Sequence, residues 1–208
     1  MSPLPVAIES PLPRIVGALC LRVIRPGDAL PLQRLLAANR SWLGPWEATH
    51  PSGRGAEPGS VPLRPMIRQM RRQQRAGQSL AFVMVYGDEV VGQLTVSDIS
   101  GGALRSASIG YWISEHAAGR GITPVAVALA IDICFEELQL HRIEICIRPE
   151  NAPSLRVVEK LGMRFEGRRA RYICIAGEWC DHDTFAVTRE DVPAGMLARL
   201  TEAGIGVR

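Results

Sequence analysis

The sequence predicts a mixed α/β domain whose central sheet is built largely from β-hairpins. Two segments of alternating apolar and polar residues, 79–86 and 90–97, flank a Gly-Asp-Glu turn, which is the pattern of a hairpin. A second pair, 164–175 and 180–188, flanks an Ala-Gly-Glu turn in the same way. Between these hairpins, two strand-like segments are each followed by a helical one, which predicts two βα units.

The first part of the chain is expected to contain an irregular leader, one strand and one helix. Residues 1–17 include four prolines and show no periodic pattern. Residues 18–25 are apolar enough for a first strand, which a Pro-Gly-Asp turn would end. Leucines at near-helical spacing then predict a helix over about 30–40.

Residues 44–65 have no periodicity and include five prolines and four glycines. This segment is too long to be a tight connection, so it predicts a functional surface loop. A short basic helix is expected next, over about 65–76. The loop would therefore separate two helices of the first half of the chain.

The second half of the chain alternates expected strands and helices before and after the last hairpin. These elements are a strand over 107–113, a helix over 121–138, a strand over 142–148, a helix over 153–161 and a short tail helix over 191–200. Apolar residues recur at helical spacing along the first of these helices, which predicts a buried helix. A proline begins the second helix, and proline suits a first helical turn.

Length and composition indicate one domain with an apolar core. The 208 residues are 47% hydrophobic and 22% charged, which excludes wholesale disorder and a collagen-like repeat. We expect the domain to span 18–190, between a leader, 1–17, and a tail, 191–208. The longest apolar run near the start, 15–21, is far short of the roughly 20 residues that span a bilayer. No secretory signal pattern is present either, so a cytoplasmic protein is expected.

Cysteine, histidine and net charge argue against several other classes of function. The five cysteines include no C-x-x-C pair, so neither a disulfide framework nor a four-ligand zinc site is expected. The four histidines show no metal-binding spacing, and no metal is predicted. A net charge of +3 is too small to indicate direct nucleic-acid binding, and no membrane contact is expected.

The turn between the strand 107–113 and the helix 121–138 is the most informative stretch. Gly119 and Gly121 lie there, where backbone N–H groups can converge and the helix dipole adds positive potential. Glycine lets the backbone approach a bulky anion, and Arg120 could add a counter-charge. The turn matches neither the dinucleotide-binding fingerprint nor a P-loop. It predicts a diphosphate site, although a glycine pair by itself more often forms an ordinary tight turn.

This stretch resembles the coenzyme A motif of the GNAT superfamily of N-acetyltransferases, whose core is Q/R-x-x-G-x-G/A. The matching residues are Gly110-Tyr-Trp-Ile and, further on, Gly119-x-Gly121-Ile-Thr. The ribosomal-protein-alanine N-acetyltransferase (Rim-type) branch has further motifs in the same order and spacing, matched here by Asn151-Ala-Pro-Ser154, Lys160-Leu-Gly-Met163, Glu166-Gly167 and Gly177-Glu-Trp-Cys-Asp-His182. The resemblance covers about 18–190. It departs at His116, where the family has Gln or Arg.

The resemblance implies the GNAT acyl-CoA N-acyltransferase fold, with a mostly antiparallel central sheet splayed at the cofactor and flanked by helices. The cofactor that it implies is acetyl-CoA. The pyrophosphate would bind to the turn made by Gly119, Arg120, Gly121, Ile122 and Thr123. A neutral His116 carries less charge to a phosphate than Arg does, so binding is expected to be weaker or dependent on pH.

The same resemblance implies roles for four residues beside the coenzyme arm. Trp112 and Ile113 would give backbone contacts to pantetheine and an N–H to the thioester oxygen. Asn151 would bond to the pantetheine arm, cap a helix, or do both. Ser154 would protonate the departing thiolate, because the tyrosine that other members have a few residues later is absent. In the alternative interpretation, the Ser154 hydroxyl caps a helix.

The sequence assigns no general base. The family often has acids at the positions of Ser108 and Ile173. Asp98, Glu178 and Asp181 remain as candidates, but no motif selects one of them. A peptide α-amine has a pKa of about 8, so a modest base or a chain of waters would suffice.

Aromatic residues near the long loop and the last hairpin have two interpretations each. Trp42 and Trp46 either line an acceptor channel or anchor the loop to the core. Tyr172 and Trp179 are expected to pack around the hairpin rather than to touch substrate. His182 is expected to be an internally bonded hairpin residue rather than a base.

Five arginines of the basic helix recur at i, i+4 spacing. They are Arg64, Arg68 and Arg72 in one row and Arg71 and Arg75 in another. They could attract the acidic coenzyme or ribosomal RNA, but such a run is more often a solvated helix face.

The activity that the resemblance implies is acetyl transfer from acetyl-CoA to a primary amine, by direct attack in a ternary complex. The implied acceptor is the N-terminal α-amine of a protein, with ribosomal proteins favoured. One alternative is a small-molecule amine such as an antibiotic or a polyamine. Another is an acyl-CoA-binding module without turnover, because acids are missing at Ser108 and Ile173. The sequence carries no signal for an oligomeric state.

Overall fold

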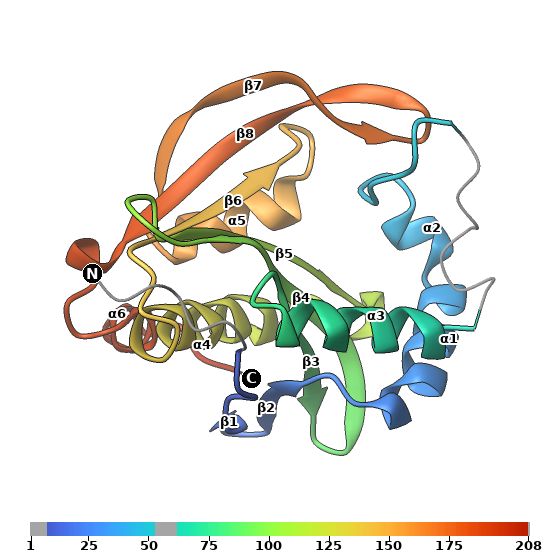
Figure 1. Cartoon of the computed structure of the whole chain (residues 1–208), viewed down its shortest axis with the longest axis horizontal. Helices are drawn as coiled ribbons and strands as arrows, with labels where there is room; N and C mark the ends of the chain where they lie inside the picture. The colour runs from blue at the N-terminus through green and yellow to red at the C-terminus, as the bar shows by residue number, and fades with distance from the viewer. Residues whose placement is uncertain (1–7, 53–61, 208) are drawn as a thin grey trace.

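The computed structural model describes residues 8–52 and 62–207, which form one eight-stranded sheet with helices on both faces (Figure 1). The strands of these residues are β1 (Arg14–Val16), β2 (Leu19–Val23), β3 (Leu80–Tyr86), β4 (Glu89–Ser100), β5 (Ser106–Ile113), β6 (Arg142–Ile147), β7 (Arg164–Ile175) and β8 (Glu178–Thr188). The α-helices are α1 (Ala29–Ala38), α2 (Arg40–Leu43), α3 (Arg64–Arg75), α4 (Ile122–Glu136), α5 (Ala152–Lys160) and α6 (Met196–Glu202). None of these helices is long and apolar enough to cross a bilayer.

The order of the strands in the sheet is β1-β2-β3-β4-β5-β6-β8-β7. Every neighbouring pair is antiparallel except β5–β6, which confirms the mostly antiparallel sheet predicted from the resemblance. Both predicted hairpins are present, as β3–β4 and β7–β8. Short 3₁₀ turns at Pro26–Asp28, Glu115–Ala117 and Arg189–Asp191 connect other elements.

Strand β1 differs from the irregular leader expected there. It pairs with β2 at the edge of the sheet, and Gly17 makes the turn between them at a φ of +57°. Three residues are too few to show alternation, and Ile15 is exposed, so no sequence pattern indicated the strand. Ile8 is buried, and its N–H donates to the carbonyl of Gln74 at 3.2 Å. Residues 1–7 lie outside the described residues.

Two apolar clusters hold the helices against the sheet. On one face α4 is buried along nearly its whole length, with α5 and α6 beside it. On the other face α1 packs over β4 and α3 over β3, and Leu32, Ile67 and Val83 belong to the same apolar cluster there. Each fully buried Leu, Ile or Val side chain contributes roughly 1.5–3 kcal/mol, so both faces of the sheet stabilise the fold. The predicted buried helix and flanking helices are confirmed.

The C-terminal helix α6 packs on α4 and brings the end of the chain back to the start of that helix. Asp132 on α4 accepts hydrogen bonds from the N–H groups of Met196 at 2.6 Å and Leu197 at 3.0 Å. Beyond α6, Ile205 and Val207 pack against the main apolar cluster. The short tail helix expected over 191–200 is therefore present but begins a few residues later.

The β5–β6 pair opens partway along its length. Residues 106–108 pair with 142–144, yet β5 continues to Ile113 and β6 to Ile147 without further pairing to each other. Because β5 stays bonded to β4 and β6 to β8, the two strands leave a wedge between them. This wedge is the splay that the resemblance predicted.

The segment after α2 reaches across to the last hairpin. Ala48 forms an isolated antiparallel bridge with Ile175, and the Thr49 N–H donates to the Cys174 carbonyl at 2.9 Å. Figure 1 shows β7 and β8 arching away from the rest of the sheet toward this segment. The first part of the predicted loop is thus tied to the hairpin, whereas residues 53–61 lie outside the described residues.

Candidate functional site

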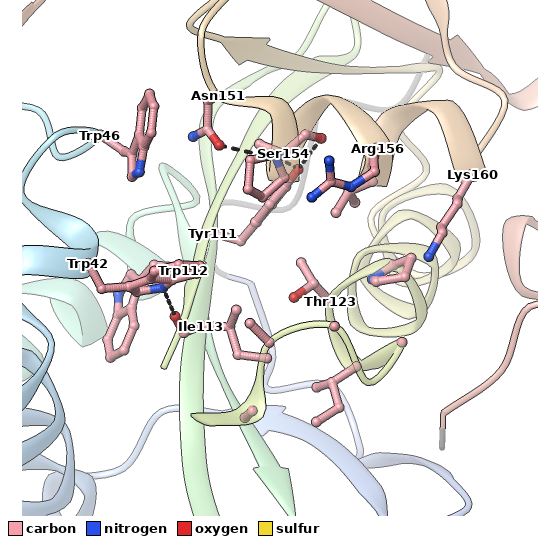
Figure 2. A pocket seen from close by; sticks show the side chains of 18 of the residues that line it. Trp42, Trp46, Tyr111, Trp112, Ile113, Thr123, Asn151, Ser154, Arg156 and Lys160 are labelled. Carbon is pink, nitrogen blue, oxygen red and sulfur yellow. Dashed lines mark hydrogen bonds between the residues drawn. The ribbon is translucent and has the colours of Figure 1, made fainter. Parts of the chain in front are cut away.

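A cavity of about 260 Å³ opens beside the end of β5. It is lined by four parts of the chain, namely α2 with the segment after it, the end of β5, the turn into α4, and α5. Figure 2 shows Trp42 and Trp46 on one side of this cavity and Thr123 and Lys160 on the other, with Ser154 between them.

Eight of the nine residues predicted for the coenzyme site line this cavity. They are Trp112, Ile113, Gly119, Gly121, Ile122, Thr123, Asn151 and Ser154. Arg120 is the exception, because its guanidinium carbon lies over the Tyr86 ring, 4.3 Å from the ring centroid, and outside the cavity lining. The structure therefore brings the predicted residues together at one cavity, except for the only cation among them, Arg120.

The peptide group of Ile113 is turned toward the wedge. The Ser114 N–H donates to the Val91 carbonyl of β4 at 2.8 Å, and neighbouring residues of a strand direct their backbone groups to opposite sides. Ile113 therefore directs its N–H and carbonyl away from β4. Its carbonyl accepts the indole N–H of Trp42 at 3.0 Å, which leaves the N–H facing the wedge. Trp112 turns its backbone to β4 instead and offers the cavity its side chain.

The turn into α4 presents a row of backbone N–H groups. Gly119 and Gly121 have φ values of +77° and +80°, a region that glycine adopts without strain. No N–H of residues 119–123 donates to any other residue that the structure describes. The first N–H groups of α4 also have no acceptor within the helix, and the helix dipole adds positive potential at this end. The turn is therefore suited to a phosphate group.

The glycine at position 121 has a second role that the sequence did not indicate. A Cβ on Gly121 would overlap the backbone carbonyl of Gly206, which returns from the C-terminal tail. A Cβ on Gly119 would meet no atom within 4 Å. Gly121 is therefore required by a contact within the protein, whereas the space at Gly119 remains open for a ligand.

Two cations to which the sequence gave no role line the cavity from α5. They are Arg156 and Lys160, one helical turn apart, and Figure 2 shows both side chains on the side where Thr123 lies. Within the described part of the chain, neither side chain has a carboxylate partner. Their i, i+4 spacing was the signal that could have identified them. They are placed to take over the counter-charge predicted for Arg120.

The hydroxyl of Ser154 faces the cavity at the start of α5. The Ser154 N–H donates to Asn151 Oδ1 at 3.2 Å, so Asn151 is the helix cap, as one of its two predicted roles required. The Ser154 hydroxyl instead lies 2.8 Å from the hydroxyl of Tyr111. Burial raises the pKa of Tyr111 far above its usual range, so Tyr111 stays protonated, and either hydroxyl can be the donor in this pair. When Tyr111 donates, the proton of Ser154 can point at a ligand.

None of the three candidate bases lies at the cavity. Asp98 accepts the Ser97 hydroxyl at 3.1 Å, Asp181 accepts the Arg171 N–H at 2.8 Å, and Glu178 begins β8 at the hairpin turn. Among the described residues, those that line the cavity include no carboxylate and no histidine. The described residues therefore assign no general base.

Trp42 and Trp46 both line the cavity and anchor its wall, whereas a part in an acceptor channel stays a prediction. Trp42 bonds to β5 through the Ile113 carbonyl. The guanidinium of Arg148 lies 5.8 Å from the Trp46 ring centroid and donates to the carbonyl of Pro45 at 3.1 Å. Arg148 follows β6, so α2 is fixed to one strand of the wedge and the segment after it to the other.

His116 lies in the turn before Gly119 but does not line the cavity. Its Nδ1 is 2.8 Å from the Ser114 hydroxyl, and its Nε2 is 3.5 Å from a carboxylate oxygen of Glu89. The Ser114 hydroxyl in turn donates to the buried Asn39 side chain at 3.1 Å. His116 thus contacts the turn itself, and a direct contact with pyrophosphate stays a prediction.

The aromatic residues and the histidine of the last hairpin differ in exposure and in their contacts. Trp179 is 55% exposed and Tyr172 is 42% exposed, and the expectation that they pack around the hairpin rather than touch substrate stays a prediction. Tyr172 accepts a hydrogen bond from Arg169 at 3.0 Å, and its ring meets His182 edge-on at a centroid distance of 6.0 Å. His182 is 4% exposed and its Nδ1 is 3.1 Å from the Cys180 carbonyl, which confirms an internally bonded histidine.

The chemistry of the site suits an acyl-CoA. A row of amides and two cations at one end match a pyrophosphate. The wedge exposes strand edges that have no partner strand, which matches a pantetheine arm that itself contains amide groups. The described residues contain no group of three or more side chains able to hold a metal ion.

Comparisons with known proteins agree with this geometry. The sequence profile described as Acetyltransferase (GNAT) domain matches residues 18–164. The probable N-acetyltransferase YjcK of Bacillus subtilis is 40% identical over 104 residues, which are 50% of this chain and 58% of that protein. The ribosomal protein uS5-alanine N-acetyltransferase of Escherichia coli is 30% identical over 185 residues, which are 85% of this chain and 91% of that one.

A solved structure covers the whole chain. It is RimJ of Mycobacterium smegmatis in complex with CoA-disulfide, which is 36% identical and superimposes with a TM-score of 0.87 over 100% of this chain and 99% of that one. Profile, relative and structure all match over the region that contains the wedge and the turn into α4. The chain belongs to the GNAT acetyltransferase family.

Proposed function

We propose that this protein transfers acetyl from acetyl-CoA to the N-terminal α-amine of a ribosomal protein. The observation that carries the proposal is one cavity that joins an anion-binding turn to an aromatic wall, with the Ser154–Tyr111 hydroxyl pair between them. The ribosomal acceptor is supported by the Escherichia coli relative, whose name gives it that activity. Such a reaction belongs in the cytoplasm, where ribosomal proteins are made.

Each group of the site then has one task. The amides of 119–123 with Arg156 and Lys160 bind the pyrophosphate, and the strand edges of the wedge align the pantetheine arm. The Ile113 N–H donates to the thioester oxygen as negative charge develops there. As the amine nitrogen bonds to the carbonyl carbon and the carbon–sulfur bond breaks, Ser154 gives its proton to the sulfur. The amine loses its proton to water, and water returns a proton to the Ser154 oxygen.

The acceptor class is tested by offering several amines at once. The purified protein is incubated with acetyl-CoA and equal amounts of four acceptors. Two are peptides, one with a free N-terminal alanine and one with a formylated N-terminal alanine and an internal lysine. The other two are a polyamine and an aminoglycoside. We expect the mass gain of one acetyl group on the free peptide alone. Acetylation of the polyamine or aminoglycoside in preference would favour a small-molecule enzyme, and binding without any product would favour an acyl-CoA-binding module.

Trp46 is expected to act on the acceptor and not on the coenzyme. Trp46→Ala removes an aromatic wall on the side of the cavity opposite the phosphate-binding turn. The KM for the acceptor peptide should rise about fivefold or more, while the Kd for acetyl-CoA stays within about a factor of two. Trp179→Ala, at an exposed tryptophan outside the cavity lining, is the matched control. An equal rise in the KM for the peptide and in the Kd for acetyl-CoA would mean that Trp46 only supports the fold.

Arg156 and Lys160 are expected to supply charge to the coenzyme site. Arg156→Gln combined with Lys160→Gln keeps the helical propensity of α5 but removes both cations. The Kd for coenzyme A, measured by calorimetry, should rise about three- to tenfold and depend less on salt. Arg105→Gln, which removes an arginine outside the cavity lining, is the control. An unchanged Kd in the double variant would exclude the two side chains from the site.

A further inference from the structure

Helix α3 carries a stripe of arginines that acetyl transfer does not use. At 3.6 residues per turn, successive residues are about 100° apart, which places Arg64, Arg68, Arg71, Arg72 and Arg75 within an arc of about 100° on one side of α3. With a rise of about 1.5 Å per residue, the stripe is about 16 Å long. α3 contains no acidic residue, so its charge alone exceeds the net charge of the whole chain.

The five arginines of this stripe are exposed and have no carboxylate partner within the described residues. Other arginines of the protein are paired, for example Arg14 with Glu136 and Arg22 with Asp28. Like charges four residues apart destabilise a helix, so the stripe costs stability unless an external anion binds it. The small net charge of the chain conceals this local excess.

The opposite flank of α3 is already occupied, which limits the kinds of anion that fit. Leu63 and Ile67 are buried in the cluster that joins α3 to β3, and a single half-exposed apolar side chain, Met66, is too little to enter a lipid surface. α3 also contains no aromatic residue on which unpaired bases could stack. A rigid row of guanidinium groups without aromatic residues matches a phosphate backbone whose spacing is fixed by base pairing.

We propose that the arginine stripe of α3 binds the phosphate backbone of structured RNA without regard to its sequence. This RNA-binding proposal rests on the proposed function, because base-paired RNA surrounds a ribosomal acceptor. α3 shares one apolar cluster with Leu43 of α2 and with Trp42, so the stripe is rigidly connected to the acceptor side of the cavity. RNA bound at α3 would thus hold the enzyme near a protein terminus on the same particle.

Binding is tested with a fluorescent RNA duplex of about 16 base pairs, the length that one double-stranded-RNA domain covers. Arg68→Gln, Arg71→Gln and Arg72→Gln are combined in one variant, and Arg105→Gln and Arg171→Gln are combined in a control that removes two arginines elsewhere, one half-buried and one exposed. We expect the wild type and the control to bind, and the α3 variant to bind about tenfold or more weakly at 100 mM salt. The slope of log K against log salt should also fall by about two to three.

Three results would overturn the proposal. They are equal RNA affinity of the α3 variant and the wild type, tighter binding to single-stranded RNA than to the duplex, and binding to phosphatidylserine vesicles without binding to RNA. The melting temperature of the α3 variant should be unchanged or higher, because like-charge repulsion is relieved.

Acetylation rates on two substrates, a free peptide and ribosomal subunits, distinguish the RNA-binding proposal from the proposed function. The α3 variant should acetylate a free peptide at the wild-type rate but acetylate ribosomal subunits several-fold more slowly. Loss of both rates would indicate misfolding, which the melting temperature detects, and equal rates on both substrates would overturn the role of the stripe. The RNA-binding assay needs no acetyl transfer. Its result can therefore be interpreted even if the proposed acetyl transfer is wrong.

Discussion

Replacing Ser154 with alanine is expected to lower kcat about ten- to a hundredfold and to leave the Kd for acetyl-CoA within about a factor of three. General acid catalysis contributes about 10²–10⁴ in rate, and a thiol, with a pKa of about 8.5, is already a fair leaving group, so the low end applies. The hydroxyl of Ser154 lies at the start of α5, where the helix dipole favours the developing thiolate. Stopped-time assays with a saturating acceptor peptide measure kcat.

Tyr111→Phe is the matched control for Ser154→Ala. Both variants lose the hydrogen bond between the two hydroxyls, which is worth about 0.5–1.5 kcal/mol, so their melting temperatures should fall by similar amounts. Only Ser154→Ala also loses the proton donor, so its kcat should fall further than that of Tyr111→Phe. Equal and small effects of the two variants on kcat would reduce Ser154 to a structural residue.

Gly119→Asn is expected to weaken acetyl-CoA binding about tenfold or more. The backbone at Gly119 has a φ of +77°, which asparagine tolerates better than other side chains, and the added atoms enter open space beside the row of amides. The protein should therefore fold while the approach of a pyrophosphate is blocked. Gly121→Val would be ambiguous, because its side chain would also overlap the carbonyl of Gly206.

The control for Gly119→Asn is Gly102→Asn, between β4 and β5. Gly102 has a φ of +65°, and a Cβ there also meets no atom within 4 Å, so the two changes are alike in backbone strain. Isothermal titration with acetyl-CoA should show wild-type affinity for Gly102→Asn. A folded Gly119→Asn protein with unchanged affinity would refute the assignment of the turn as a phosphate site.

Features encoded by short-range patterns could be predicted from the sequence. Alternating residues gave both hairpins, and the apolar spacing along α4 gave a buried helix, because period and burial are linked locally. The resemblance added the splay of β5 from β6 and eight residues that line the cavity, but not Arg156 and Lys160. Strand β1 was not predicted, because three residues on a sheet edge bury too few side chains to produce an alternating apolar pattern.

Features that depend on contacts between distant segments could not be predicted. Tyr111 belongs to the recognised Gly-Tyr-Trp-Ile motif, yet its role depends on α5 bringing Ser154 beside it. Arg120 was expected in the site because of its neighbours in sequence, but its side chain rotates onto Tyr86. The requirement for glycine at 121 comes from Gly206, at the far end of the chain.

Tandem mass spectrometry of ribosomal proteins incubated with this protein and acetyl-CoA tests the proposed reaction most directly. The acceptors are extracted in a form whose N-termini are free, and the fragment ions locate each new acetyl group on an individual nitrogen atom. We predict one acetyl group, on the N-terminal α-amine of one or a few ribosomal proteins, and about ten- to a hundredfold less of it when Ser154→Ala is assayed for the same short time. Acetyl groups found on lysine side chains, with the N-termini left free, would contradict the proposed reaction.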